Sequence, residues 1–396
     1  MKNVLIASFD MEVGGVERSL ISMLDNFDYE KYTVDLMLYR HQGDFMTLIS
    51  DRVNIIGEVP EYTTFRKSIG KTLSEKYFGI GLSRILSKLY ANLKGRFKGI
   101  AEPGYYQLQL MWKFALPFLP NMQKEYDVAI SYLWPHYFIA EKVKAKTKIA
   151  WIHTDYSTVY TDVNIDIKVW KKFDYIVSIS NDCTSAFLSK YPELREKIVL
   201  IENITSPAFI KKMAEEKVDD ILIGNNHFNI VSVGRLSYQK AFDNAIKALR
   251  ILHNRGLTNL KWYVVGYGGE EKKLNELIKE NNLEDSFILL GKKINPYPYI
   301  KLSDLYVQPS RYEGKAVTVR EAQILSKPVL ITNYATAKSQ VDDGVDGYIT
   351  ELSVEGIVNG IENLYNSSAT RKKLIGNCSL ANYGNSYELD KLYKVI

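Results

Sequence analysis

Residues 304–325 read DLYVQPSRYEGKAVTVREAQIL. The first part, residues 304–310, predicts a strand that ends in a turn, and Val319–Leu325 predicts a helix. A proline then stops the helix before another apolar run, Val329–Thr332, which predicts the next strand. Glu313 therefore lies on a loop at the carboxyl end of a strand, which is the edge where open α/β sheets bind ligands.

Glu313 and Glu321 are two carboxylates eight residues apart, one on this loop and one at the start of the helix. Together they can hold one small polar ligand, and Gly314 and Ala316 permit its close approach to the backbone. The spacing alone is weak, because a chain with 46 acidic residues contains many such pairs. The position between a strand and a helix makes this pair a candidate site.

Strands and helices alternate in two series along the 396 residues, separated by a polar, charged stretch at 211–226. The first series of predicted strands comprises residues 4–9, 34–38, 53–57, 127–132, 148–152, 175–180 and 197–201, and the second comprises 229–233, 260–265, 287–290, 305–308 and 329–332. Apolar strands that alternate with helices are typical of a parallel sheet covered on both faces. The α/β pattern predicts two Rossmann-like domains, 1–205 and 206–396, whose parallel sheets face each other across a cleft. The last residues could pack back on the first domain.

Composition narrows the class of protein. Hydrophobic content of 46% and charged content of 24% are ordinary for a soluble globular protein. The two cysteines, Cys183 and Cys378, indicate a reducing compartment rather than a disulfide scaffold, and neither has zinc-finger spacing. The N-terminal residues predict a first strand rather than a signal peptide, and no run of 18 apolar residues occurs. We therefore expect a cytoplasmic protein.

Cationic and small residues follow several other strands. Arg235 and Lys240 lie five residues apart after one strand, where two fixed cations could neutralise a departing diphosphate without a metal. A solvated surface pair is the alternative. Gly14 and Gly15 lie between the first strand and a helix, where backbone N–H groups can face an anion. A plain tight turn is the alternative there.

Two further candidates are less specific. Gly266 opens a Gly-Tyr-Gly-Gly turn after residues 260–265, but the turn lacks the full dinucleotide fingerprint, so we reject NAD binding. His153 ends the strand at 148–152, and a histidine in such a place is more often a structural hydrogen-bonding group than a catalyst.

These motifs together resemble the family 4 retaining glycosyltransferases, which have the GT-B fold. The resemblance rests on the E-x7-E pair Glu313 and Glu321, on Gly-Gly-Val-Glu-Arg at 14–18, on Gly-Arg-Leu and the following lysine at 234–240, and on Gly-Tyr-Gly at 266–268. Lys315 and Ala316 depart from the usual Glu-Gly-Phe-Gly form, and Ala241 stands where glycine is usual. The likeness extends from about residue 14 to 350 and is weakest at 58–122.

The resemblance implies a retaining, hexosyltransferase-type enzyme that moves a sugar from a nucleotide-sugar donor to an acceptor hydroxyl. Glu313 then contacts the donor sugar, Glu321 binds the ribose, and Arg235 and Lys240 hold the diphosphate. His153 points toward the transferred sugar. Further donor contacts are implied at Gly15, Gly266, Ala316, Val317 and Thr318. The donor should lie mainly on the C-terminal domain and the acceptor mainly on the N-terminal domain. A UDP-sugar is favoured over a GDP-sugar, and no cofactor or metal is expected.

Two other classes of function stay open. One is a non-catalytic sugar-nucleotide-binding or scaffold protein of the same fold, and the other is a nucleotide-sugar epimerase-like enzyme. A decayed enzyme would have lost at least one of the motif residues, and all of them are present. An epimerase would turn over nucleotide sugars without an acceptor.

The segment 62–119 has a charge and a pattern of its own. Residues 62–100 contain nine Lys or Arg and one acid, so the local charge is +8, whereas the whole chain carries +5. An apolar stripe recurs at helical spacing, bordered by Arg84, Lys88 and Lys94; its members are Phe78, Leu82, Ile85, Leu86, Leu89 and Leu93. Such a helix is typical of a contact with an anionic membrane, and packing of the stripe on the sheet is the alternative.

Nucleic acid is disfavoured as a partner of this basic segment, because no recognition module appears in the sequence. With the glycosyltransferase resemblance, the segment predicts a lipid-linked or surface-polysaccharide glycan as acceptor. It also predicts a peripheral location at the inner face of a membrane.

Overall fold

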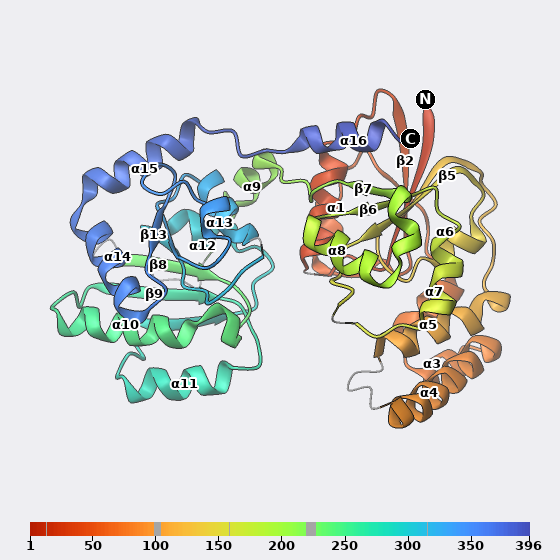
Figure 1. Cartoon of the computed structure of the whole chain (residues 1–396), viewed down its shortest axis with the longest axis horizontal. Coiled ribbons are helices and arrows are strands. Elements are labelled where there is room, and N and C mark those ends of the chain that lie inside the picture. The colour runs from red at the N-terminus through yellow and green to blue at the C-terminus, as the bar shows by residue number, and fades with distance from the viewer. Residues whose placement is uncertain (13, 99–103, 158, 219–226, 315) are drawn as a thin grey trace. The chain divides into compact units, whose positions relative to one another are not determined.

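The computed structural model describes residues 1–12, 14–98, 104–157, 159–218, 227–314 and 316–396. The chain divides into two compact units. Unit 1 comprises Met1–Thr205 and Asn385–Ile396, and unit 2 comprises Ser206–Gly384. Each unit is built around one sheet with helices on both faces (Figure 1).

The sheet of unit 1 has seven parallel strands in the order β3-β2-β1-β4-β5-β6-β7. These are β1 (Lys2–Ser8), β2 (Tyr32–Leu38), β3 (Asn54–Ile55), β4 (Tyr126–Ser131), β5 (Ala145–Ile152), β6 (Tyr175–Ser178) and β7 (Ile198–Leu200). The helices are α1 (Gly15–Asp25), α2 (Pro60–Thr63), α3 (Ile69–Ser74), α4 (Phe78–Lys98), α5 (Gly104–Ala115), α6 (Tyr137–Lys142), α7 (Val163–Trp170), α8 (Asn181–Lys190) and α16 (Leu389–Tyr393). The strand interiors are mainly apolar, as a sheet covered on both faces requires, and the buried Asp35 in the middle of β2 is paired with Lys124 at 2.8 Å.

The sheet of unit 2 has six parallel strands in the order β10-β9-β8-β11-β12-β13. These are β8 (Phe228–Val233), β9 (Leu260–Val265), β10 (Phe287–Gly291), β11 (Leu305–Gln308), β12 (Val329–Thr332) and β13 (Tyr348–Thr350). The helices are α9 (Pro207–Met213), α10 (Phe242–Asn254), α11 (Glu271–Glu280), α12 (Tyr297–Leu302), α13 (Val317–Ile324), α14 (Val354–Asn366) and α15 (Ser368–Leu380). The predicted pair of Rossmann-like, all-parallel domains is therefore confirmed.

In each sheet the strand order reverses between the first and the fourth strand of the unit. The reversal lies between β1 and β4 in unit 1 and between β8 and β11 in unit 2. Loops that leave neighbouring strands in opposite directions open a crevice at the carboxyl edge, which is where ligands bind in open α/β sheets. The topology thus marks one position in each unit for a site.

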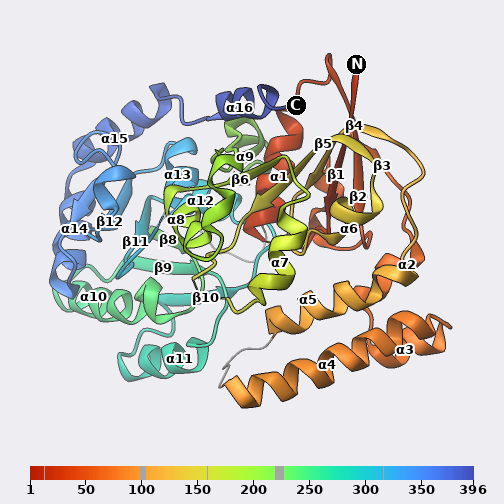
Figure 2. The same ribbon diagram turned by 45° about the vertical axis from the view of Figure 1, so that its right-hand side comes forward.

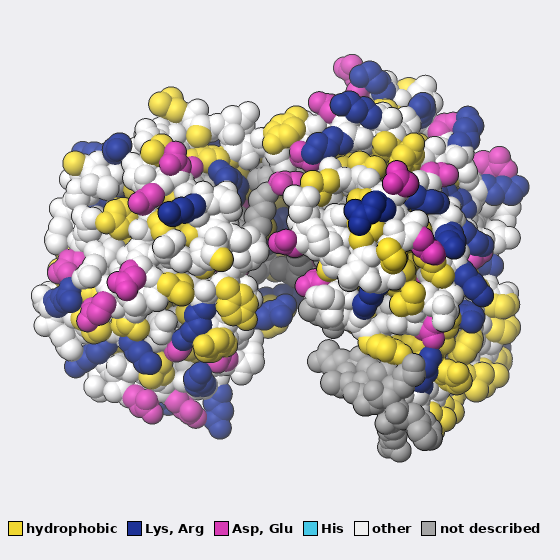
Figure 3. All heavy atoms as spheres, in the orientation of Figure 1, with side chains coloured by type: hydrophobic (Ala, Val, Ile, Leu, Met, Phe, Trp, Pro, Cys, Tyr) yellow, Lys and Arg dark blue, Asp and Glu magenta, His cyan; other side chains and the backbone are white. Residues whose placement is uncertain are grey.

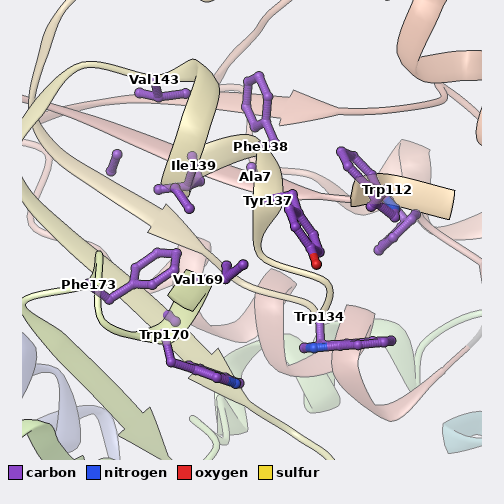
Figure 4. Close-up of a cluster of buried hydrophobic side chains, with 14 of the residues drawn as sticks. Ala7, Trp112, Trp134, Tyr137, Phe138, Ile139, Val143, Val169, Trp170 and Phe173 are labelled. Atoms are coloured by element: carbon purple, nitrogen blue, oxygen red, sulfur yellow. The ribbon is translucent and has the colours of Figure 1, made fainter. Parts of the chain in front are cut away.

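Aromatic side chains dominate the core of unit 1 (Figure 4). Trp112, from α5, is completely buried and stacks on Phe65 with ring centroids 4.1 Å apart. Burial of such large rings contributes several kcal/mol at about 25 cal/mol per Å². Trp112 therefore anchors α5 and the chain around residue 65 to the body of unit 1.

Helix α4 packs lengthwise on α5, as both ribbon views show (Figures 1 and 2). Its inward face is lined by small side chains, because Ser83, Ser87 and Ala91 are all buried. Ser83 Oγ also donates a hydrogen bond to the Phe114 carbonyl of α5. Of the large apolar side chains of α4, Ile80 near its start is buried in the core of unit 1, whereas Leu82, Leu86, Leu89 and Leu93 are exposed.

Two cations predicted to border the apolar stripe of α4 turn inward instead. Arg84 Nη1 donates to the Thr64 carbonyl at 2.6 Å, and burial lowers the pKa of its guanidinium. Lys94 Nζ lies 2.8 Å from Asp162 Oδ2. Both cations therefore stabilise unit 1 and are not available to a membrane, which corrects the sequence prediction at these two positions.

The last helix, α16, packs on unit 1. The ring of Tyr393 stacks on Tyr32 with centroids 5.3 Å apart, and its hydroxyl accepts a hydrogen bond from the Asp28 backbone N–H at 2.8 Å. The Glu388 carboxylate accepts from the Glu202 N–H at 3.0 Å. These contacts attach the C-terminal residues to unit 1.

Candidate functional site

The loops after β8 and β11 meet at the switch point of unit 2. Lys240 ends the first loop and Glu313 lies on the second, 73 positions later. Lys240 Nζ is 2.6 Å from Glu313 Oε1, and the two side chains are only 16% and 6% exposed. Lys240 and Glu313, which the sequence analysis identified in two separate motifs, thus form one ion pair. Because water is largely excluded, this pair is stronger than an exposed one.

Three neutral groups also hold the Glu313 carboxylate. Its Oε1 accepts from Ser310 Oγ at 2.6 Å and from Gln308 Nε2 at 3.4 Å. Its Oε2 accepts from Gln239 Nε2 at 3.2 Å. These contacts therefore hold the carboxylate at a defined place between the two loops.

Gln308, the last residue of β11, is the buried support of this network. Its Oε1 accepts hydrogen bonds from the hydroxyls of Tyr306 at 2.7 Å and Thr318 at 3.3 Å. Its amide nitrogen donates to Ser310 Oγ at 2.8 Å as well as to Glu313. Because hydroxyls occupy the oxygen side, the NH₂ side must face the carboxylate. The sequence analysis did not single out Gln308.

Arg311 clamps the same two loops together. Its Nη1 and Nη2 donate to Asp243 Oδ1 and Oδ2 at 2.9 and 2.7 Å, and the guanidinium lies 4.1 Å from the ring centroid of Tyr238. Bidentate pairs of this kind fix geometry as well as add energy. Burial alone would raise the pKa of Asp243, but the hydrogen bonds from Arg311 hold it below the ordinary value. Neither residue was predicted, although Arg311 is only two positions from Glu313.

The remaining predicted cation, Arg235, is exposed on the loop after β8. The stem of Lys240 runs over Gly234, where a Cβ would lie 3.1 Å from Lys240 Cε. Ala241, which stands where the resembled family has glycine, adopts a left-handed conformation with φ of 55°. The loop thus has the shape that glycine favours, with alanine in its place.

Gly266 has a packing reason to be glycine. Its φ is +156°, and a Cβ would lie 1.8 Å from the Gly234 carbonyl oxygen. The loops after β8 and β9 therefore touch backbone to backbone at this point. The close approach explains this residue without a ligand, and its donor contact stays a prediction.

The start of α13 holds the other predicted donor contacts. The Ala316 N–H donates to Gln340 Oε1 at 2.8 Å, so it is already bonded within the protein, and the donor contacts of Val317 and Thr318 stay a prediction. Glu321 is only 1% exposed and accepts from the Tyr297 hydroxyl at 3.0 Å. Lys315, the departure from the usual motif, lies outside the described residues.

In unit 1, His153 follows β5 with its ring 4.6 Å from that of Tyr132. Across the described part of the chain, neither ring nitrogen has a hydrogen-bond partner. Burial lowers its pKa to about 3, so the imidazole is neutral at physiological pH. A structural histidine would use its ring nitrogens in hydrogen bonds within the protein. Neither nitrogen of His153 does so among the described residues, so both are available to a ligand group.

His136 is a second buried histidine, which the sequence analysis did not single out. It lies just after β4, at the switch point of unit 1, and its Nδ1 is 2.8 Å from Ser131 Oγ. Burial, together with the nearby His153, lowers its pKa to about 3. Its place directly after a strand is the same signal that drew attention to His153.

Gly14 and Gly15, at the start of α1, have different surroundings. A Cβ on Gly14 would lie 2.2 Å from the Glu17 carboxylate, whereas no heavy atom lies within 4 Å of one on Gly15. Burial raises the pKa of Glu17 above its ordinary value. A side chain at residue 14 would therefore displace the Glu17 carboxylate, whereas Gly15 leaves open space at the helix start.

Comparison with known proteins agrees with this geometry. Residues 213–379 match the family model "Glycosyl transferases group 1", and this range includes both loops of the unit 2 site. The amylovoran biosynthesis glycosyltransferase AmsD of Erwinia amylovora is 29% identical over 171 residues, which cover 43% of this chain and 45% of AmsD. The N-acetylgalactosamine-N,N'-diacetylbacillosaminyl-diphospho-undecaprenol 4-alpha-N-acetylgalactosaminyltransferase of Campylobacter jejuni is 28% identical over 165 residues, 41% of this chain and 44% of the relative.

The chain spans about half the length of the first curated relatives it matches. Among solved structures, Anabaena Alr3699/HepE in complex with UDP and glucose has a TM-score of 0.60 and 18% identity, with 99% of this chain and 95% of that one covered. The C-terminal half of the chain is thus similar to glycosyltransferases, and the structural likeness over the whole chain shows a shared fold. The GT-B fold predicted from the motifs is confirmed.

Two other properties bear on function. No helix among residues 1–98 and 104–396 that the structure describes is long and apolar enough to cross a bilayer. Within the same described residues, no group of three or more His, Cys, Asp or Glu side chains could hold a metal ion.

Proposed function

We propose that this chain is a retaining glycosyltransferase that moves a sugar from a UDP-sugar to a hydroxyl of a glycan acceptor. The observation that carries the proposal is the Lys240–Glu313 pair, 2.6 Å apart at the switch point of unit 2. It joins a cation suited to a diphosphate with a carboxylate suited to sugar hydroxyls. A purely structural ion pair would not need the further donors that orient Glu313.

On this proposal Lys240 exchanges partners during the reaction. Without donor it neutralises Glu313; with donor it turns to the diphosphate, joined by the exposed Arg235. The bond between the anomeric carbon and the phosphate oxygen breaks, and its electron pair leaves with the diphosphate. The two cations stabilise that charge, so no metal is required for it. The acceptor oxygen then bonds to the same face of the sugar, and its proton passes to the departing phosphate.

Glu313 and Glu321 take different parts. Once Lys240 has turned away, Glu313 accepts hydrogen bonds from the sugar and keeps it against the reacting centre. Glu321, from α13, binds the ribose of the donor. The N–H groups of Val317 and Thr318 complete the phosphate contacts at the start of the same helix.

His153 and the acceptor complete the proposal in unit 1. The neutral imidazole of His153 offers one donor and one acceptor to a sugar hydroxyl. We assign the acceptor to the class of lipid-linked or surface-polysaccharide glycans. Support comes from the C. jejuni relative, whose name specifies a diphospho-undecaprenol acceptor, and from AmsD in amylovoran biosynthesis. The UDP preference is supported by the UDP complex of HepE.

Thermal stabilisation by UDP, GDP and their sugars tests the donor, since a ligand stabilises the state it binds. We expect UDP-selective stabilisation that Lys240→Gln abolishes and Lys272→Gln, on the exposed face of α11, does not change. Turnover that requires an acceptor, with the product anomer assigned by NMR, tests transfer and retention. Binding without turnover would identify a scaffold protein, and turnover without acceptor an epimerase-like enzyme; either result refutes the proposal.

A further inference from the structure

The outward face of α4 is a continuous apolar stripe with no covering element among the described residues. Five of the six residues predicted for the stripe are exposed, Ile85 is half-buried, and Tyr90 joins the exposed set. The exposed members are between 49% and 63% exposed: Phe78, Leu82, Leu86, Leu89, Tyr90 and Leu93. They recur at helical spacing and extend over about 22 Å of a 21-residue helix. Figure 3 shows hydrophobic side chains gathered over this part of unit 1, at the lower right.

The arrangement reverses that of an ordinary surface helix. In such a helix the large apolar side chains face the core and polar ones face water. In α4 the buried positions after the first turn, Ser83, Ser87 and Ala91, are small, and Ile80 is the buried apolar residue near the start of the helix, while the leucines are exposed. Because exposed apolar surface of this extent is costly in water, the stripe indicates a contact outside the unit.

The charge beside the stripe identifies the class of partner. Lys71, Lys76 and Lys88 are exposed, whereas Glu75 is the only acid in the described residues 62–98 and 104–120. Glu75 is itself neutralised by Lys67 at 2.7 Å. Lys88 therefore places positive charge on α4 itself, and Lys71 and Lys76 add positive charge on the chain that leads into the helix.

We propose that this face of α4 docks flat on an anionic lipid bilayer, with the stripe among the acyl chains and the lysines at the headgroups. A helix with this division lies in the interface plane rather than across it. A second copy of the chain is a worse occupant, because a two-fold contact would set the same lysines against each other. All residues of the docking face lie in unit 1. The idea that docking brings the protein to a lipid-linked acceptor rests on the proposed function.

Sedimentation of the full chain with vesicles tests the docking. We expect binding to vesicles that contain phosphatidylglycerol, weak binding to pure phosphatidylcholine, and release at high salt. Leu82→Gln, Leu86→Gln and Leu89→Gln together should weaken binding on the order of 100-fold, since about half of each side chain would otherwise be buried. Glutamine is a good helix former, so α4 should persist.

Two matched controls separate the face from general surface effects. Leu302→Gln, Leu352→Gln and Leu380→Gln change three exposed leucines of unit 2 and should leave binding unchanged. Lys71→Gln and Lys88→Gln should each weaken binding about five-fold at low salt, whereas Lys372→Gln and Lys373→Gln should not.

UDP-dependent stabilisation, measured on the same samples, reports on unit 2 independently. Wild-type protein that responds to UDP but ignores anionic vesicles would overturn the docking and leave the proposed function standing. Vesicle binding without any nucleotide response would do the reverse. Unchanged binding of the triple leucine variant, or a dimer that this variant dissociates, would also overturn the docking.

Discussion

Replacement of Lys240 by glutamine should expose how much of the site depends on one ion pair. Without the ammonium, Glu313 keeps only Ser310, Gln308 and Gln239 as donors, at 6% side-chain exposure. Loss of one partner of a fully buried pair costs about 3–5 kcal/mol, but three remaining hydrogen bonds compensate part of it, so we expect about 2 kcal/mol. Glu313→Gln should cost about 1 kcal/mol, because the freed ammonium can reach water.

The double variant completes the cycle. Lys240→Gln with Glu313→Gln should be less destabilised than the sum of the two, with a coupling of about 1–2 kcal/mol in urea unfolding. With saturating UDP the coupling should fall toward zero, because Lys240 then contacts phosphate. Lys240→Gln should also lower kcat by about 10²-fold or more, by loss of a preorganised charge.

The coupling measured with UDP and the coupling measured without UDP together test whether Lys240 exchanges partners. Equal coupling with and without UDP would mean that Lys240 never leaves Glu313, and the exchange of partners would be refuted. Near-normal turnover of Lys240→Gln would remove the diphosphate assignment itself.

Three other variants and conditions have defined outcomes. Arg311→Lys replaces a bidentate clamp on Asp243 with a single contact, so it should lower the free energy of unfolding by about 1–2 kcal/mol and reduce kcat, as urea titration and steady-state assays would measure. Gly266→Ala should cost about 3 kcal/mol or more in thermal unfolding, whereas Gly269→Ala, with nothing within 4 Å, should be nearly neutral. The pKa values of His136 and His153 are lowered to about 3 in the folded protein, whereas the unfolded value is about 6.5. Between these two pH values both histidines are neutral in the folded protein and protonated in the unfolded chain. Stability should therefore fall with decreasing pH by up to about 2.7 kcal/mol per pH unit from the two groups, and His153→Phe should halve that slope.

Much of the fold was predictable because apolar runs and helical spacing reflect burial directly. Short elements were not: the run 53–57 predicted a strand of that length, but β3 is only Asn54–Ile55. That strand lies at the edge of the sheet and pairs with β2 alone, so its length depends on one partner rather than on its own sequence.

The site residues were predictable one at a time, and their arrangement was not. Glu313 and Lys240 carry chemistry that a ligand would use, so each is visible at the end of a strand. Their pairing depends on β8 and β11 being neighbours, which only the strand order reveals. Gln308 and Asp243 were missed for another reason: each acts on a protein side chain, and nothing in residue type distinguishes such a support from an ordinary polar residue.

The orientation of α4 is the clearest case in which periodicity cannot decide between two structures. The spacing of Leu82, Leu86 and Leu89 establishes one apolar face, and both core packing and an external contact satisfy it. The choice depends on the opposite face, where Ser83, Ser87 and Ala91 are small enough for α4 to pack lengthwise on α5. Arg84 and Lys94 then fix that orientation by bonds to Thr64 and Asp162. Inversion of the helix would break both bonds and would place leucines against α5 at the positions that Ser83, Ser87 and Ala91 now occupy, so the apolar face points away from the core of unit 1.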